Sequence, residues 1–274
     1  MKRFNLHLVS DSTGETVSSV ARAAVAQFDD VEPEEFNWTL VRTPSQMEKV
    51  MESIGENPGA VMYTLADNRL RDQLKMECAR RGLPCIAVLA PTVAELSSYL
   101  GQEIHALPGR QHVMDEDYFL RVDAISYALA HDDGQAHWEL DDADIVLVGV
   151  SRTSKSPTCV YLAYKGYKCA NIPFVLGCPL PDGIEHLRKP LVVGLTIGTE
   201  RLQQIRQSRL QSLKQDQDTN YVDMDHMQQE ITESRKLFSR CRWPVIDVTR
   251  KSVEETAAMI IQHLEKHREK MAGQ

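Results

Sequence analysis

The fold class of this chain is decided by residues 145–156, which read Ile145-Val146-Leu147-Val148-Gly149-Val150-Ser151-Arg152-Thr153-Ser154-Lys155-Ser156. The first four residues are apolar, and three of them are β-branched, so they predict a buried strand. A helical pattern follows from Ser156 to Tyr164, and Pro157 suits its first turn, where backbone N–H groups have no partner within the helix. A buried strand that leads through a short loop into a helix is typical of a parallel sheet covered by helices.

The loop in this stretch resembles the phosphate-binding P-loop, G-x-x-x-x-G-K-[ST], with Ser154 in place of the second glycine. In such a loop the backbone N–H groups converge on an anion, and the following helix adds the positive end of its dipole. We expect Lys155 to reach the outer phosphates and Ser156 to ligate Mg²⁺. Residues 149–156 are therefore the predicted nucleotide site, with Lys155 and Arg152 as candidate catalytic cations. Serine allows less backbone freedom than glycine, so an ordinary turn with a surface lysine stays open as the alternative.

Strand and helix patterns alternate through both halves of the chain, which predicts α/β folds with parallel sheets. The predicted strands are residues 6–9, 36–41, 60–64, 84–89, 144–148, 168–172, 191–196 and 244–248. The predicted helices are residues 17–28, 45–54, 68–81, 115–131, 156–164, 200–214, 223–240 and 252–270. We place a domain boundary near Gly134. The prediction is an N-terminal Rossmann-like parallel-sheet domain in residues 1–134 and a C-terminal P-loop kinase-like α/β domain in residues 135–274.

A second polar constellation follows the first predicted strand, where the chain reads Ser10-Asp11-Ser12-Thr13-Gly14. Open α/β sheets bind ligands at the carboxyl ends of their strands, so Ser10, Asp11, Ser12 and Thr13 are a candidate second anion site. Ser12 or Thr13 could instead serve only to cap the helix that follows.

Other polar residues are weaker candidates. Arg201, Arg206 and Arg209 share one arc of a predicted helix, where they could form a lid over phosphate or a solvated charged face. Asp247 follows two apolar residues in a predicted strand and is the candidate catalytic carboxylate for holding magnesium. The run His131-Asp132-Asp133 could supply acid–base chemistry or form a hydrophilic turn.

Composition narrows the class of protein. The 274 residues carry 31 Lys and Arg against 39 Asp and Glu, a formal charge of −8 that disfavours non-specific binding to nucleic acid or anionic membrane. No apolar run has the length needed to span a bilayer, and the start of the chain has no signal-peptide pattern. The six cysteines have spacings that suggest neither a zinc site nor a disulfide framework. We expect a cytoplasmic protein that binds neither nucleic acid nor membrane.

With these residues in view, the chain resembles the bacterial and plant pyruvate, phosphate dikinase regulatory proteins, relatives of the phosphoenolpyruvate synthase regulatory proteins. The resemblance covers nearly the whole chain. It rests on five stretches, namely Val9 to Thr16, Ala130 to Gly134, Gly149 to Thr158, Gly194 to Thr196 and Trp243 to Thr249.

This resemblance implies a bifunctional regulator. Members of the family use ADP to phosphorylate a threonine of the dikinase, which inactivates it. They reverse the change with inorganic phosphate, which takes the phosphoryl group and leaves as pyrophosphate. The family's nucleotide site falls here on residues 149–156, where Ser154 replaces the usual glycine and Ser156 the usual threonine. The resemblance identifies no general base in this chain and leaves open whether the protein forms homo-oligomers.

Three alternatives stay open on the sequence. The target could be phosphoenolpyruvate synthase. The second half alone would also suit a small-molecule P-loop kinase, although the first half would then have no assigned role. A nucleotide-sensing module without catalysis is the alternative from another functional class.

Overall fold

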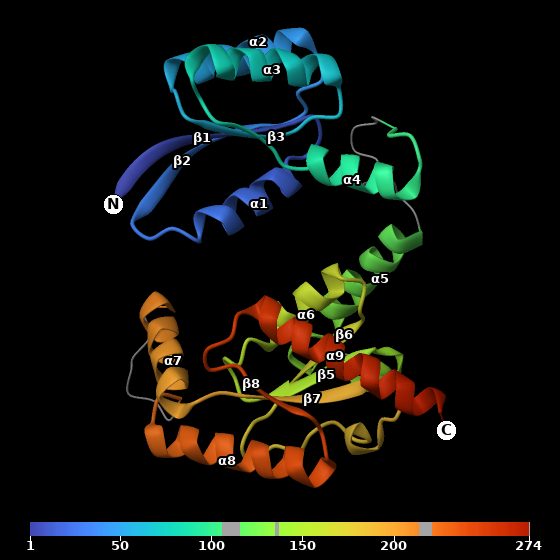
Figure 1. The fold of residues 1–274 in the computed structure, drawn as a ribbon. Coiled ribbons are helices and arrows are strands. Elements are labelled where there is room, and N and C mark those ends of the chain that lie inside the picture. Colours follow the sequence, from blue (N-terminus) through green and yellow to red (C-terminus); the bar gives the residue numbers. More distant parts are fainter. Residues whose placement is uncertain (106–115, 135–136, 214–220, 274) are drawn as a thin grey trace. The chain divides into compact units, whose positions relative to one another are not determined.

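The computed structural model describes residues 1–105, 116–134, 137–213 and 221–273. The chain divides into two compact units, Met1–Val113 and Met114–Gln274. Each unit holds a four-stranded sheet in which every neighbouring pair of strands is parallel. The predicted α/β class with two parallel sheets is therefore confirmed (Figure 1).

Unit 1 has helices on both faces of a sheet with strand order β2-β1-β3-β4. Its elements are β1 (Lys2–Ser10), α1 (Glu15–Val25), β2 (Val31–Trp38), α2 (Pro44–Glu56), β3 (Ala60–Thr64), α3 (Asn68–Arg81), β4 (Cys85–Ala87) and α4 (Ala90–Leu100). Side chains alternate across the sheet: Leu6 and Leu8 of β1 pack with α1, and Val9 packs with α2 and α3. Figure 1 shows α1 on one side of the sheet and α2 with α3 on the other.

The largest differences from the sequence prediction in unit 1 concern β2 and α4. We expected the second strand at residues 36–41, but β2 occupies Val31–Trp38. The stretch Glu32-Pro33-Glu34-Glu35 is charged and contains a proline, which is why it did not suggest a strand. It is tolerated because β2 is an edge strand, where one side of the backbone has no ladder partner. Helix α4 was not predicted at all.

Unit 2 repeats the same plan with strand order β6-β5-β7-β8. Its strands are β5 (Ile145–Gly149), β6 (Cys169–Pro173), β7 (Leu191–Thr196) and β8 (Val245–Asp247). Its α-helices are α5 (Glu116–Ala130), α6 (Lys155–Tyr164), α7 (Thr199–Leu213), α8 (Met224–Cys241) and α9 (Val253–Ala272), with 3-10 helices η2 (Asp132–Gly134), η3 (His137–Asp142) and η4 (Ile184–His186). In each unit the first strand is central, flanked by the second and third.

The central strand β5 is buried along its whole length and positions the loop that follows it. Ile145 and Leu147 pack on the face covered by α6 and α9, whereas Val146 and Val148 pack on the face covered by α8 (Figure 1). Helix α8 approaches closely, because a Cβ at Gly194 of β7 would lie 2.4 Å from a ring carbon of Phe238. The loop after β5 therefore leaves a strand that is held firmly on both faces.

The boundary between the two units lies earlier in the chain than the join we expected near Gly134. Helix α5 packs against α6 and β6, so it belongs with unit 2. Among the described residues, no helix is both long and apolar enough to cross a bilayer.

Candidate active site

The loop after β5 is a tight turn. A Cβ at Gly149 would lie 2.6 Å from the carbonyl oxygen of Leu195, so only glycine fits there. Arg152 (φ 75°) and Ser154 (φ 59°) both adopt positive φ angles that L-residues rarely take. The buried hydroxyl of Thr153 donates to the carbonyl oxygen of Val150 at 2.9 Å and closes the turn from inside. Helix α6 then begins at Lys155 without a side-chain cap, so its first N–H groups have no partner from a capping side chain.

Ser154 occupies the left-handed conformation (φ 59°, ψ 24°) that glycine would adopt more easily. We therefore expect Ser154→Gly to keep ADP affinity within about twofold and the free energy of unfolding within about 1 kcal/mol, since relief of strain offsets the added freedom of the unfolded chain. Ser154→Val should cost about 1–2 kcal/mol, because β-branched residues tolerate positive φ poorly. Chemical denaturation and ADP titration of both variants check this. A tenfold loss of ADP affinity in the glycine variant would contradict it.

Lys155 points its amino group into the turn. Its side chain is 6% exposed, and Nζ donates to the carbonyl oxygen of Val150 at 3.0 Å. Burial lowers the pKa of Lys155 to about 8, while the nearby carboxylates of Asp133 and Asp132 act to raise it. A cation that is poorly hydrated in the free protein gains more from an arriving phosphate than a solvated one would.

The hydroxyl of Ser156 meets a carboxylate from outside the loop. Ser156 Oγ donates to Asp132 Oδ1 at 2.9 Å. Asn171, from the buried strand β6, directs Nδ2 at the same carboxylate oxygen (2.5 Å), at Ser156 Oγ (3.0 Å) and at Asp133 Oδ1 (3.3 Å). The turn η2 thus brings Asp132 and Asp133 to the N-terminal end of α6.

Oxygen atoms of this cluster fit a magnesium ion held jointly with a nucleotide. Asp132 and Ser156 supply a carboxylate and a hydroxyl, and Asn171 Oδ1 is buried without a hydrogen-bond partner among the described residues. Mg²⁺ is usually bound through one or two carboxylates plus substrate phosphates. The described residues contain no group of three or more His, Cys, Asp and Glu side chains that could hold a metal, so the phosphates would have to complete the coordination.

His131 takes part in packing. Its ring stacks on Tyr127 with centroids 3.7 Å apart, and Nδ1 lies 2.8 Å from the carbonyl oxygen of Tyr127. Its own carbonyl oxygen accepts the backbone N–H of Asn171 at 3.0 Å. Of the run His131-Asp132-Asp133, it is therefore the two carboxylates that face the loop.

The three arginines of α7 separate in the structure. Arg201 and Arg209 are exposed. Arg206, in contrast, is 1% exposed, and its guanidinium is hydrogen-bonded to other groups of the protein. It donates to the carbonyl oxygens of Ser151 (3.3 Å) and Tyr221 (2.9 Å) and to the Glu230 carboxylate (2.8 Å). Arg206 thus holds the loop after β5 against α8, and the role of the other two as a lid stays a prediction.

Asp247 lies at the carboxyl end of β8, two strands away from β5. Its carboxylate accepts the backbone N–H of Thr249 at 2.9 Å and the Thr249 hydroxyl, and it lies 3.8 Å from Arg235. Burial acts to raise the pKa of Asp247, but hydrogen bonds from Thr249 and the charges of Arg235 and Lys251 outweigh it and the pKa is lowered. Asp132 is the carboxylate that contacts Ser156, so the geometry favours it over Asp247 as the partner of the loop.

Several polar groups of the run Ser10 to Thr13 already form hydrogen bonds with neighbouring protein groups. Ser10 Oγ accepts from the Thr64 hydroxyl (3.0 Å) and from the Ser12 N–H (3.1 Å), and the buried Asp11 carboxylate accepts the N–H of Ala66. Burial raises the pKa of Asp11, although the Ala66 N–H and the charge of Arg42 act against it. Ser12 is half-buried and Thr13 is exposed. A second anion site at Ser10 to Thr13 stays a prediction.

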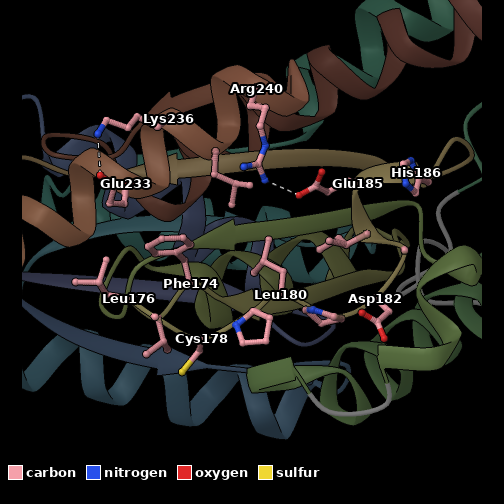
Figure 2. A pocket seen from close by; sticks show the side chains of 17 residues that line it. Phe174, Leu176, Cys178, Leu180, Asp182, Glu185, His186, Glu233, Lys236 and Arg240 are labelled. Carbon is pink, nitrogen blue, oxygen red and sulfur yellow. Dashed lines mark hydrogen bonds and ion pairs between the residues drawn. The ribbon is translucent and has the colours of Figure 1, made fainter.

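A hollow of about 700 Å³ lies between α8 and the loop that follows β6 (Figure 2). It begins at Phe174, whose N–H donates to the carbonyl oxygen of Gly149 at 2.9 Å. Two basic residues that line the hollow form ion pairs with acidic residues that also line it. Lys236 lies 2.8 Å from Glu233, and Arg240 lies 2.7 Å from Glu185. The loop after β5, with its inward lysine and the uncapped start of α6, is better suited to an anion than this hollow.

Sequence reasoning missed two residues of the site. Asn171 is a polar residue in the otherwise buried strand β6, and this contrast is a signal that could have found it. Tyr221 follows the polar run Gln215-Asp216-Gln217-Asp218-Thr219-Asn220, and nothing in that pattern points to the loop.

Comparison with known proteins shows to which family this chain belongs. The sequence profile of the kinase/pyrophosphorylase family matches residues 6–261. The chain belongs to this family. A relative from Paramagnetospirillum magneticum, provisionally named a pyruvate, phosphate dikinase regulatory protein, is 53% identical over 98% of this chain and 87% of its own length. A relative from Maricaulis maris with the same provisional name is 50% identical over 95% of this chain and 93% of its own length. The family resemblance derived from the sequence motifs is therefore confirmed.

Proposed function

We propose that this kinase/pyrophosphorylase family member is a bifunctional serine/threonine kinase and phosphorylase that acts on pyruvate, phosphate dikinase. It would inactivate the dikinase by ADP-dependent phosphorylation of a threonine and reactivate it by phosphate-dependent removal of that group. The observation that carries the proposal is the convergence of Lys155, Ser156 and Asp132 at the uncapped start of α6. The names of the relatives support the dikinase as target.

In the forward direction the threonine hydroxyl oxygen attacks the β-phosphorus of ADP, the bond to the bridging oxygen breaks, and AMP leaves. Such transfer depends chiefly on positioning and charge neutralisation. Lys155 and the loop N–H groups would neutralise the transferred group, and Arg152 would contact it from the loop. Ser156 and Asp132 would hold a magnesium ion, which supplies further positive charge when bound. Asp133, which is exposed beside them, would take the hydroxyl proton.

In the reverse direction an oxygen of inorganic phosphate attacks the phosphorus of the phosphothreonine. The bond to the threonine oxygen breaks, that oxygen takes up a proton, and pyrophosphate forms. Two anions must approach each other here, so the same loop cations are needed to screen their repulsion.

The test uses purified pyruvate, phosphate dikinase with this protein. ADP should add one phosphoryl group to a threonine of the dikinase, which mass spectrometry detects. After removal of ADP, added phosphate should remove the group and release an equal amount of pyrophosphate. Dephosphorylation that proceeds without phosphate would mean an ordinary phosphatase.

A parallel reaction with phosphoenolpyruvate synthase tests the alternative target. ADP turnover with small hydroxyl acceptors would favour a small-molecule kinase, and binding without any transfer would favour a sensing module.

The pKa of Lys155 makes ADP affinity depend on pH. Below about pH 8 the amino group is protonated and attracts phosphate, and above it the group becomes neutral in the free protein. We therefore expect the dissociation constant of ADP to rise by up to about tenfold per pH unit above about pH 8. Calorimetric titration between about pH 7 and about pH 9.5 measures this. Lys155→Arg is the control, because its guanidinium does not titrate in this range and should flatten the profile. An unchanged slope in that variant would contradict the assignment to Lys155.

A further inference from the structure

Tyr221 lies beside the phosphate loop although it is 65 or more positions away from Gly149 to Ser156 in the chain. Arg152 Nε donates to the Tyr221 hydroxyl at 3.1 Å. The same hydroxyl lies 3.4 Å from Ser151 Oγ. Because an arginine N–H can only donate, the tyrosine oxygen accepts from Arg152, and its own proton is free to point to Ser151. Two loop side chains are thus oriented by one hydroxyl.

Tyr221 is itself fixed by the buried Arg206. The Arg206 guanidinium lies over the Tyr221 ring, 4.4 Å from the centroid, and donates to the Tyr221 carbonyl oxygen at 2.9 Å. It also donates to the carbonyl oxygen of Ser151 at 3.3 Å and is paired with Glu230 of α8. The tyrosine and the loop therefore share one buried support, and their spacing is set by it.

The contact with Tyr221 engages only Nε of Arg152 and leaves the two outer guanidinium nitrogens, Nη1 and Nη2, for a ligand. Its Nε is used by Tyr221, and the hydrogen bonds of the described residues do not use its Nη1 and Nη2 atoms. An arginine held at Nε presents these two nitrogens as a planar fork, which matches two oxygens of a phosphate group. The strained backbone of Arg152 (φ 75°) is the kind of outlier that functional loops retain.

We propose that Tyr221 is a positioning residue that holds Arg152 as a two-pronged ligand for the terminal phosphate of the nucleotide. This inference rests on the proposed function, because it takes ADP as the ligand of the loop. Tyr221 need not touch the nucleotide. It acts through Arg152, and Arg206 acts through Tyr221.

A double-mutant cycle tests the proposal on the full chain. ADP is titrated by calorimetry into the wild type, Arg152→Ala, Tyr221→Phe and the double variant. Arg152→Ala should weaken ADP binding about tenfold, and Tyr221→Phe about three- to tenfold. The double variant should bind no more weakly than Arg152→Ala alone, because the tyrosine acts only through the arginine. Tyr161→Phe, which removes a hydroxyl from α6, is the matched control and should bind ADP as the wild type does.

A merely structural role for Tyr221 would give a different result. The melting temperature without ADP would fall, and the two losses of affinity would add up in the double variant. Either additive losses or a Tyr221→Phe variant with wild-type affinity would overturn the positioning role and leave the proposed function standing. A wild-type protein that binds no ADP would overturn both.

Discussion

Replacing Lys155 with methionine is expected to slow phosphoryl transfer strongly while making the fold more stable. The lysine cation sits where the loop N–H groups and the start of α6 meet, so its loss should lower kcat/KM about a hundredfold or more. Transfer from ADP to the dikinase, followed by mass spectrometry under limiting enzyme, measures this part. A variant that keeps transfer within about fivefold of the wild type would remove the basis of the phosphate-loop assignment.

The expected gain in stability follows from the burial of the Lys155 side chain in the folded protein. The pKa of Lys155 is lowered to about 8 in the fold, against its ordinary 10.5, so the folded state holds its proton less tightly than the unfolded chain. The protonated side chain therefore costs stability below about pH 8, and this cost disappears as the pH rises from about 8 to 10.5. Methionine keeps the chain length without the charge, and we expect a gain of about 1–3 kcal/mol at neutral pH. The carbonyl oxygen of Val150 still accepts the Thr153 hydroxyl, so it does not lose its last partner.

Chemical denaturation at neutral pH and at about pH 10 checks the stability claim, and the advantage of the methionine variant should shrink at the higher pH. Lys165→Met is the matched control, since Lys165 is exposed at the other end of α6 and should show neither effect. A Lys155→Met protein that is less stable than the wild type would contradict the account of its pKa.

Replacing Arg206 with methionine should lower the free energy of unfolding of unit 2 by about 3–5 kcal/mol. The substitution leaves Glu230, whose side chain is 12% exposed, without its partner at 2.8 Å. It also removes the donors to the carbonyl oxygens of Ser151 and Tyr221. We expect the melting temperature to fall on the order of 10 °C, which scanning calorimetry measures.

Two further variants test whether the loss of stability comes from the pair of Arg206 and Glu230. Arg201→Met removes an exposed arginine from the same helix and should change the free energy of unfolding by less than about 0.5 kcal/mol. Adding Glu230→Gln to Arg206→Met should recover part of the loss, because the largely enclosed Glu230 side chain, 12% exposed, is then no longer charged. An Arg206→Met protein as stable as Arg201→Met would show that this buried pair does not support the loop.

Much of the fold could be predicted from the sequence because most elements are regular. The strand Ala60–Thr64 and the helix Asn68–Arg81 were predicted with their observed bounds, since an apolar run and a capped helical pattern mark them clearly. The strand β2 could not be predicted in place, because its edge position permits proline and glutamate that a central strand would exclude. Local patterns carry no information on which strand is at the edge.

The residues of the candidate site also fall into two groups, those that the sequence could predict and those that it could not. The residues 149–156 form a continuous motif, so their position on a strand, loop and helix could be derived directly. Asp132, Asn171 and Tyr221 come from separate segments, and only the parallel pairing of β5 with β6 and the packing around Arg206 bring them to the loop. The sequence left Arg206 as part of a lid over phosphate or of a solvated charged face, whereas it is buried and its hydrogen bonds join it to protein groups. Periodicity placed it on the helix but could not show which neighbours would surround it.

In each unit the helix that follows the central strand begins in the same manner. Gly14 before α1 (φ 83°) and Ser154 before α6 (φ 59°) are both left-handed, and neither helix has a side-chain cap. Each of these turns follows the central strand of a sheet with the same strand order. This is the arrangement that duplication of one ancestral gene segment would leave after the two copies had diverged in sequence. Common descent of the halves would then be recorded in backbone torsions and strand connectivity.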